Sequence, residues 1–181
     1  AIVGLGWWGR VLVEAVQGTS ETIRFEAAAT RTRVKGEAFA AEQNFLLLNS
    51  FEDVLRMPEV DAVVLTTPDS QHADQVVAVA QAGKHVFVEK PFAQTMASAE
   101  PALRAVETAG VTLGVGFQRR FHPAMEQLRD WVQADELGTV SLCEATMCAA
   151  DALGPHGPGL YPTWCGEPAQ CAARRRPASP G

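Results

Sequence analysis

The chain has 181 residues, 47% of them hydrophobic, which is enough for one domain with a buried core and part of a second. Its formal net charge of −6 argues against a protein that binds nucleic-acid phosphates or anionic membranes. No apolar run approaches the roughly 20 residues of a membrane helix, and the first residues lack a signal-peptide pattern. The cysteine spacings match no common zinc or redox motif, so no metal site is predicted. We expect a cytoplasmic protein.

Strand-like and helix-like segments alternate up to about residue 118. The predicted strands cover residues 1–5, 24–30, 61–67, 84–89 and 111–117. The predicted helices cover residues 8–17, 34–44, 50–57, 70–83 and 97–110. Apolar strands that are each followed by a helix are typical of a parallel sheet covered on both faces. The sequence therefore predicts an α/β, doubly wound Rossmann domain over residues 1–120.

Capping residues mark several of the predicted helix ends. Ser50 is expected to cap the helix that follows it, because serine is a preferred N-cap residue. Asp69 or Ser70 is expected to cap the helix over residues 70–83 for the same reason. Pro101 is expected in the first turn of its helix, where a proline removes no hydrogen bond.

The sequence changes character after residue 120. A helix is predicted over residues 122–138 and a strand over 139–150, so residues 121–153 are interpreted as the start of an incomplete second α/β domain. Residues 154–181 are so rich in Gly, Pro and Arg that no regular element is predicted there. This tail is either a disordered natural extension or, as we favour, foreign to the fold. A frameshift in a G/C-rich gene would give such a composition.

The segment GLGWWG carries the first functional motif. Gly4, Gly6 and Gly9 have the spacing G-x-G-x-x-G between a predicted strand and a predicted helix, the context that a dinucleotide-binding loop requires. The first glycine permits a tight turn, the second lets a pyrophosphate approach the backbone, and the third allows close helix packing. The alternative is a turn without a ligand. We predict a dinucleotide site that also includes Trp7 and Trp8.

The end of the second predicted strand indicates which dinucleotide is bound. An NAD site usually has an acidic residue there for the ribose hydroxyls, whereas this chain has Thr30, Arg31 and Arg33. Glu26 is too early, at the beginning of the strand. A hydroxyl and two guanidinium groups suit a 2′-phosphate, although two solvated arginines remain the alternative. We predict NADP, with NAD as the second possibility.

The segment TTPDSQH follows the strand predicted over residues 61–67. Ligands of doubly wound sheets bind beyond the carboxyl ends of the strands, so Thr67 and Pro68 are predicted to line the cofactor site. His72 is expected in the first turn of the next helix, near the cofactor. A surface histidine without a role is the alternative.

The segment HVFVEKPFAQT ends a predicted core strand with Glu89, Lys90 and Pro91. Lys90 is expected to project into the same crevice, where an ammonium group could hydrogen-bond a substrate hydroxyl and stabilise developing alkoxide charge. Glu89 could position that lysine. The alternative is a structural ion pair between the two side chains.

Five segments taken in order resemble the Gfo/Idh/MocA family of NAD(P)-dependent oxidoreductases. They are AIVGLGWWG, TTPDSQHADQ, FVEKPFAQT, GVGFQRRFHPAM and ELGTVSLCEATM, and the resemblance runs from Ala1 to about Ala150. It implies an N-terminal Rossmann domain and a C-terminal α/β domain with an open, mostly antiparallel sheet that often mediates homo-oligomers. It also implies hydride transfer between the nicotinamide and a sugar, inositol or related polyol or carbonyl substrate.

The resemblance implies roles for individual residues as well. The lysine of the family's EKP motif matches Lys90 and contacts the substrate and the nicotinamide ribose, and Arg119 matches a segment that approaches the cofactor. The histidine and acid of the family's second domain have no counterpart in this sequence. The hypothesis is an NADP-dependent sugar or polyol oxidoreductase; the alternative is a truncated, inactive dinucleotide-binding remnant.

Overall fold

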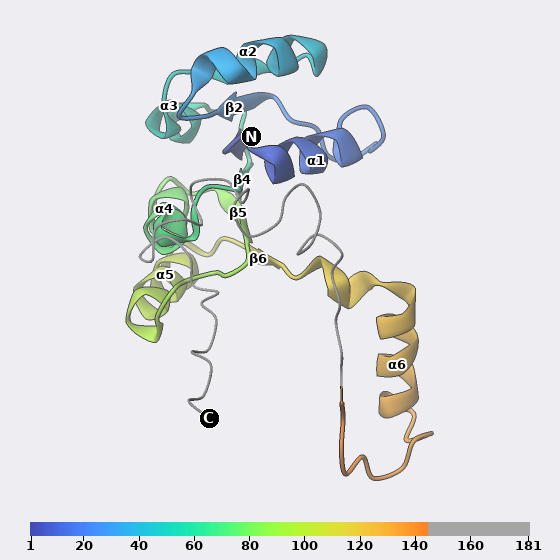
Figure 1. Cartoon of the computed structure of the whole chain (residues 1–181). Helices are drawn as coiled ribbons and strands as arrows, with labels where there is room; N and C mark the ends of the chain where they lie inside the picture. Colours follow the sequence, from blue (N-terminus) through green and yellow to red (C-terminus); the bar gives the residue numbers. More distant parts are fainter. Residues whose placement is uncertain (145–181) are drawn as a thin grey trace, which may run out of the picture. The chain divides into compact units, whose positions relative to one another are not determined.

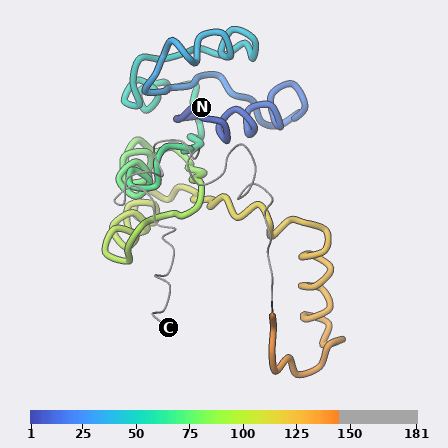
Figure 2. The backbone as a smooth tube through the Cα atoms, viewed as in Figure 1, coloured from blue at the N-terminus to red at the C-terminus, as the bar shows by residue number. Residues whose placement is uncertain are grey.

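The structure is a computed structural model that describes residues 1–144. Its described part divides into one unit over Ala1–Gly116 and a second that begins at Phe117 (Figure 1). The backbone trace in Figure 2 follows the same residues from the N-terminus onward. The tail predicted over residues 154–181 lies outside the described residues.

The first unit is built on a parallel sheet of six strands in the order β3-β2-β1-β4-β5-β6, with every neighbouring pair parallel. The strands are β1 (Ile2–Val3), β2 (Ala27–Ala29), β3 (Leu46–Leu48), β4 (Ala62–Leu65), β5 (His85–Glu89) and β6 (Leu113–Gly116). This order confirms the predicted Rossmann fold. β3 is not predicted from the sequence, because its three leucines have neither alternation nor β-branched residues.

Five helices cover the two faces of this sheet: α1 (Trp7–Val16), α2 (Arg33–Glu42), α3 (Phe51–Arg56), α4 (His72–Gln81) and α5 (Met96–Ala109). Ile2, Ala28 and Val64 pack with residues of α1 and α2 in one core cluster. The neighbouring residues in these strands, Val3 and Ala29 among them, pack with residues of α3, α4 and α5 in the other cluster. Successive strand residues point to opposite faces, so each strand serves both layers.

Of the two predicted helix N-caps, one is confirmed and the other is wrong. Ser50 accepts a 3.1 Å hydrogen bond from the Asp53 amide at the start of α3, as expected. Asp69 and Ser70 do not cap α4, because a short 3-10 helix, η1 (Asp69–Gln71), precedes it and no side chain caps α4. Pro101 lies inside α5 rather than in its first turn. Thr95 and Ser98 form a capping box that starts α5 earlier than predicted.

The second unit contains the 3-10 helix η2 (Gln118–Phe121) and the helix α6 (Pro123–Gln133). The helix predicted over residues 122–138 is therefore shorter than expected, and Asp135 with φ of 58° follows its end. Of the strand predicted over residues 139–150, residues 139–144 form no strand and the rest lie outside the described residues. The apolar side chains of α6 are exposed, at 37–52% of their full area: Met125, Leu128, Trp131 and Val132.

None of the helices within residues 1–144 is long and apolar enough to cross a membrane.

Candidate dinucleotide site

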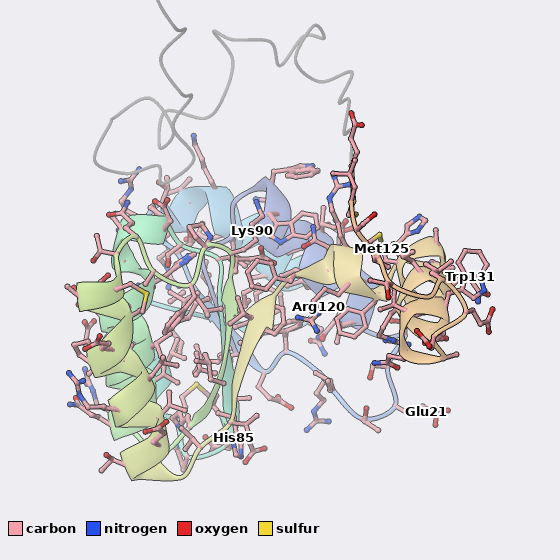
Figure 3. All side chains as sticks on the ribbon, turned by 90° about the horizontal axis from the view of Figure 1, so that it is seen from below. Glu21, His85, Lys90, Arg120, Met125 and Trp131 are labelled. Atoms are coloured by element: carbon pink, nitrogen blue, oxygen red, sulfur yellow. The ribbon has the colours of Figure 1, made fainter. Side chains whose placement is uncertain are left out.

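The parallel register brings the predicted functional loops of the first unit to one edge of the sheet. Val3 of β1 pairs with Leu65 of β4, and Leu65 pairs with Val88 of β5. The loops that follow these strands therefore leave the sheet side by side at its carboxyl edge, where doubly wound folds bind ligands. Figure 3 shows Lys90 at the end of β5 opposite to His85.

Two glycines of the first loop are required by the packing of the chain itself. Gly4 has a φ of 101°, and a Cβ atom on it would lie 2.7 Å from the carbonyl oxygen of Thr66. A Cβ atom on Gly9 would lie 2.1 Å from the carbonyl oxygen of Gly4 and 2.8 Å from Thr66 Oγ1. All three distances are far below van der Waals contact. The turn between β1 and α1 thus tolerates no side chain at either position.

Gly6 differs, because a Cβ atom placed on it meets no protein atom within 4 Å. Its φ of −69° is also open to other residues, so neither packing nor backbone geometry demands glycine there. Gly6 is the N-cap of α1, has no capping side chain, and precedes a first turn without acidic residues. An uncapped helix N-terminus with an open approach fits a pyrophosphate group.

Trp7 and Trp8 form the first turn of α1, and their ring centroids are 5.5 Å apart. Trp7 is 77% exposed. The indole Nε1 of Trp8 is buried and has no hydrogen-bond partner in the described structure. Trp7 is therefore an exposed residue directly after Gly6, whereas the indole nitrogen of Trp8 is buried.

The structure separates the two arginines predicted for a 2′-phosphate. Arg33 Nη1 donates to the carbonyl oxygen of Leu47 at 2.6 Å and to Asn49 Oδ1 at 3.1 Å, and its Nε lies 3.5 Å from Glu37 Oε1. Arg31 is exposed and makes no hydrogen bond or ion pair within residues 1–144. Arg33 is thus committed to the edge strand β3. Only Arg31 keeps its guanidinium group available.

Thr30 and Glu26 lie at opposite ends of β2, as predicted, and the role of Thr30 at the cofactor stays a prediction. Thr30 directly follows the strand. Its methyl group packs close to Gly36 of α2, where an added Cβ atom would lie only 3.1 Å from it. Glu26 precedes β2, at the opposite end, and pairs with Arg24. No carboxylate therefore follows β2 within the loop of residues 30–32.

The loop after β4 contains Thr67, Pro68 and, at the first position of α4, His72. The Thr67 hydroxyl donates to Gln75 Oε1. The alternative of a surface histidine is wrong, because His72 is only 1% exposed. Its Nδ1 lies 2.7 Å from the carbonyl oxygen of Pro91, and its Nε2 lies 2.8 Å from that of Thr67. Both ring nitrogens face the chain's own backbone, so His72 offers neither of them to a ligand.

Glu89 and Lys90 point in different directions, as neighbouring residues at the end of a strand do. Glu89 is 7% exposed, and its carboxylate lies over Gly116, where a Cβ atom would come within 2.5 Å of Oε1. Its Oε2 accepts a 3.2 Å hydrogen bond from the Lys90 amide, while the Lys90 side chain is exposed. No ion pair joins the two side chains in the part of the chain that the structure describes. Glu89 therefore supports the Lys90 backbone rather than its ammonium group.

Arg119 belongs to the second unit, in η2, where its side chain is exposed. Its role at the cofactor stays a prediction.

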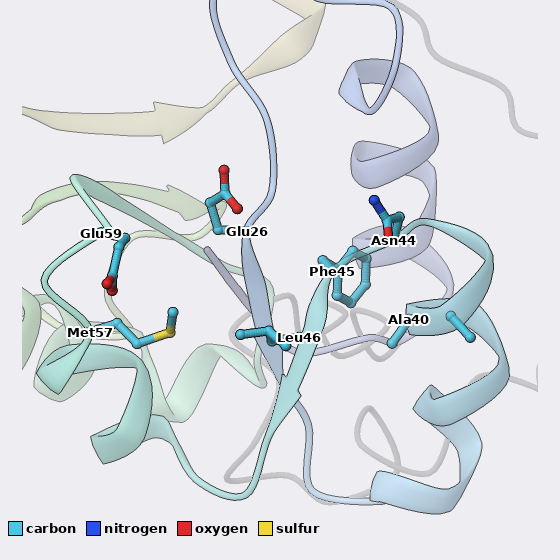
Figure 4. A pocket seen from close by; sticks show the side chains of 8 residues that line it. Glu26, Ala40, Asn44, Phe45, Leu46, Met57 and Glu59 are labelled. Atoms are coloured by element: carbon cyan, nitrogen blue, oxygen red, sulfur yellow. The ribbon is translucent and has the colours of Figure 1, made fainter.

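A pocket of about 460 Å³ lies away from these loops, beside the amino ends of β2 and β3 (Figure 4). Glu26 and Glu59 are its charged residues, and Phe45, Leu46 and Met57 supply apolar lining. Two carboxylates do not suit a dinucleotide phosphate. This pocket was not foreseen from the sequence and is no part of the dinucleotide site.

A parallel sheet in this order, a glycine turn that leads into an uncapped helix N-terminus, and open loops at the same edge define a dinucleotide-binding Rossmann domain. The family profile described as "Oxidoreductase family, NAD-binding Rossmann fold" matches residues 1–117. The chain belongs to this family, Gfo/Idh/MocA.

Relatives with known names support the assignment. The chain is 33% identical over 145 residues to the scyllo-inositol 2-dehydrogenase (NAD(+)) of Bacillus subtilis, covering 76% of this chain and 41% of the relative. The crystal structure of a putative myo-inositol dehydrogenase from Sinorhizobium meliloti matches with a TM-score of 0.70 and 31% identity. The match covers 76% of this chain and 41% of that one. The crystal structure of a putative NADPH-dependent oxidoreductase from Desulfitobacterium hafniense matches with a TM-score of 0.73 and 28% identity. This match covers 77% of this chain and 40% of that one.

The chain spans about two fifths of the length of the relatives it matches. Their names favour the oxidoreductase hypothesis and give no support to the alternative of an inactive remnant.

Proposed function

We propose that this chain provides the cofactor half of an oxidoreductase that transfers hydride between NADP(H) and a hydroxyl or carbonyl group of a sugar, inositol or related polyol. The observation that carries the proposal is the glycine loop, whose open glycine, Gly6, lies at the same edge of the sheet as Lys90. The names of the inositol dehydrogenases among the relatives support the substrate class. Residues 1–120 would bind the cofactor, and residues 121–153 would begin a second domain.

The cofactor would lie with its pyrophosphate at Gly6 and the N-terminus of α1, beside the exposed indole of Trp7. Thr67 and Pro68 would line the site from the loop after β4, and Arg119 would approach it from η2. The bound nicotinamide supplies or accepts the hydride.

The choice of NADP rests on the end of β2. Arg31 would pair with the 2′-phosphate, since its guanidinium group has no partner in the described structure and no carboxylate competes for it in its loop. Arg33 plays no part in this proposal, because β3 and Glu37 already hold it. One solved relative is named as NADPH-dependent and one curated relative as using NAD(+), so both cofactors occur among the relatives.

Lys90 would act on the substrate. Its exposed ammonium group can hydrogen-bond a substrate oxygen and stabilise the negative charge that develops there during hydride transfer. Glu89 would fix the main chain from which that ammonium group projects, through the bond from the Lys90 amide.

Titration of the purified chain with NADPH and with NADH, followed by cofactor fluorescence, tests the proposal. We expect both to bind and NADPH to bind more tightly. Tighter binding of NADH would remove the role of Arg31, and binding of neither would contradict the dinucleotide site.

A further inference from the structure

His72 connects the loop after β4, which contains Thr67 and Pro68, to the loop after β5, which contains Lys90. Its ring lies between the carbonyl oxygen of Thr67, after β4, and that of Pro91, after β5, at 2.8 and 2.7 Å. The ring is 1% exposed, so water cannot replace either contact. Pro91 directly follows Lys90. A movement of the ring would therefore displace the backbone beside the proposed substrate-binding lysine.

The chemistry of the two partners restricts what the ring can do. A carbonyl oxygen only accepts hydrogen bonds, and a neutral imidazole carries a single N–H. At each of the two carbonyl oxygens the ring can therefore act only as a donor, and the tautomer decides which nitrogen carries the N–H. Within the described residues, the other two histidines have the opposite arrangement: His85 Nδ1 accepts from the Thr112 amide at 3.0 Å, and His122 Nδ1 accepts from the Ala124 amide at 3.3 Å.

We propose that His72 is a positioning residue that locks the loop after β5 onto the loop after β4 and thereby sets the direction of the Lys90 side chain. The effect of His72 on catalysis rests on the role proposed for Lys90. The contacts of His72 with the two loops lie within the chain and do not depend on that role. It differs from the cofactor contact predicted for His72 from the sequence, because no ring nitrogen faces the ligand.

Hydrogen exchange measured on the chain without cofactor tests the lock by itself, so its outcome does not depend on the proposed function.

Two amide substitutions separate the two contacts. The side-chain amide nitrogen of Asn can take the place of Nδ1, so His72→Asn keeps the contact to Pro91. That of Gln can take the place of Nε2, so His72→Gln keeps the contact to Thr67. Hydrogen exchange without cofactor should rise about tenfold in residues 90–95 for the Gln variant and in residues 66–71 for the Asn variant.

Lys90 gives the second measurement. Its rate of acylation should change in the Gln variant and stay near the wild-type value in the Asn variant, while exposed Lys35 serves as the control in both. An equal rise of exchange in both loops and in α2 for both variants would mean that His72 only fills the core, and would overturn the proposal. Unchanged exchange in both variants would also overturn it.

Discussion

The hydroxyl of Thr66 donates a 2.6 Å hydrogen bond to the carbonyl oxygen of Gly4, which joins the loop after β4 to the glycine loop after β1. A second, longer contact of 3.2 Å runs from the same hydroxyl to the carbonyl oxygen of Val3. The same hydroxyl excludes a side chain from Gly9, since a Cβ atom there would lie 2.8 Å from it. Thr66 and the glycines thus hold the start of α1 close to the sheet.

Replacing Thr66 by Val keeps the shape of the side chain and removes this donor. The carbonyl oxygen of Gly4 then loses a partner in a partly buried place, so we expect a loss of about 1 kcal/mol in the free energy of unfolding. Cofactor affinity should fall several-fold, because the loop is no longer held. Urea denaturation and NADPH titration measure the two effects. Thr108→Val on the exposed face of α5 is the control, and an equal loss there would contradict the assignment.

Alanine substitutions at Gly6 and Gly9 should affect different properties: cofactor affinity at Gly6 and folding stability at Gly9. Gly6→Ala adds a methyl group where no protein atom lies within 4 Å, so thermal stability should stay close to wild type while NADPH affinity falls at least tenfold. Gly9→Ala places a methyl group 2.1 Å from the Gly4 carbonyl oxygen and should cost about 3 kcal/mol of stability. Thermal denaturation and titration on both variants check this. Intact binding in Gly6→Ala would contradict a pyrophosphate at this position.

The contrast between these glycines shows what the sequence could reveal. The spacing of Gly4, Gly6 and Gly9 predicted the loop and its fold correctly, because turn geometry is local. The spacing could not show which glycine the protein itself requires and which is left open. That distinction depends on Thr66, which is distant in sequence and close only in the folded sheet.

The arginines and His72 show the same limit. The sequence does not distinguish Arg31 from Arg33, yet only Arg33 donates a hydrogen bond to the carbonyl oxygen of Leu47. Leu47 belongs to β3, a strand that the sequence does not predict. The motif TTPDSQH placed His72 at the start of a helix but could not show that Pro91 lies against its ring. Contacts between loops of different strands require the tertiary fold.

The two arginines provide a matched pair of variants. Arg31→Ala should weaken NADPH binding roughly tenfold to a hundredfold, the range expected for a lost charge-assisted contact to phosphate, and leave NADH binding unchanged. Arg33→Ala should instead lower the free energy of unfolding, because β3 loses the hydrogen bonds from Arg33. The ratio of the NADPH and NADH dissociation constants should stay the same. Fluorescence titrations with both cofactors decide this. If the ratio changes in Arg33→Ala and not in Arg31→Ala, the assignment of the 2′-phosphate is wrong.

Replacing Lys90 should affect turnover far more than cofactor binding, because a single contact to the nicotinamide ribose is a small part of the dinucleotide site. The ammonium group is exposed, and the structure describes no hydrogen bond or ion pair for it, so Lys90→Ala should leave the fold and the NADPH dissociation constant within about threefold of wild type. Any turnover of a polyol or inositol substrate should be lost, because developing alkoxide charge would have no donor. Lys90→Arg, which keeps the charge but changes the donor geometry, should retain binding and recover little of the rate. Steady-state assays in the direction of NADP reduction, with NADPH titration on the same preparations, measure both quantities. Unchanged turnover in Lys90→Ala would limit the lysine to a structural role.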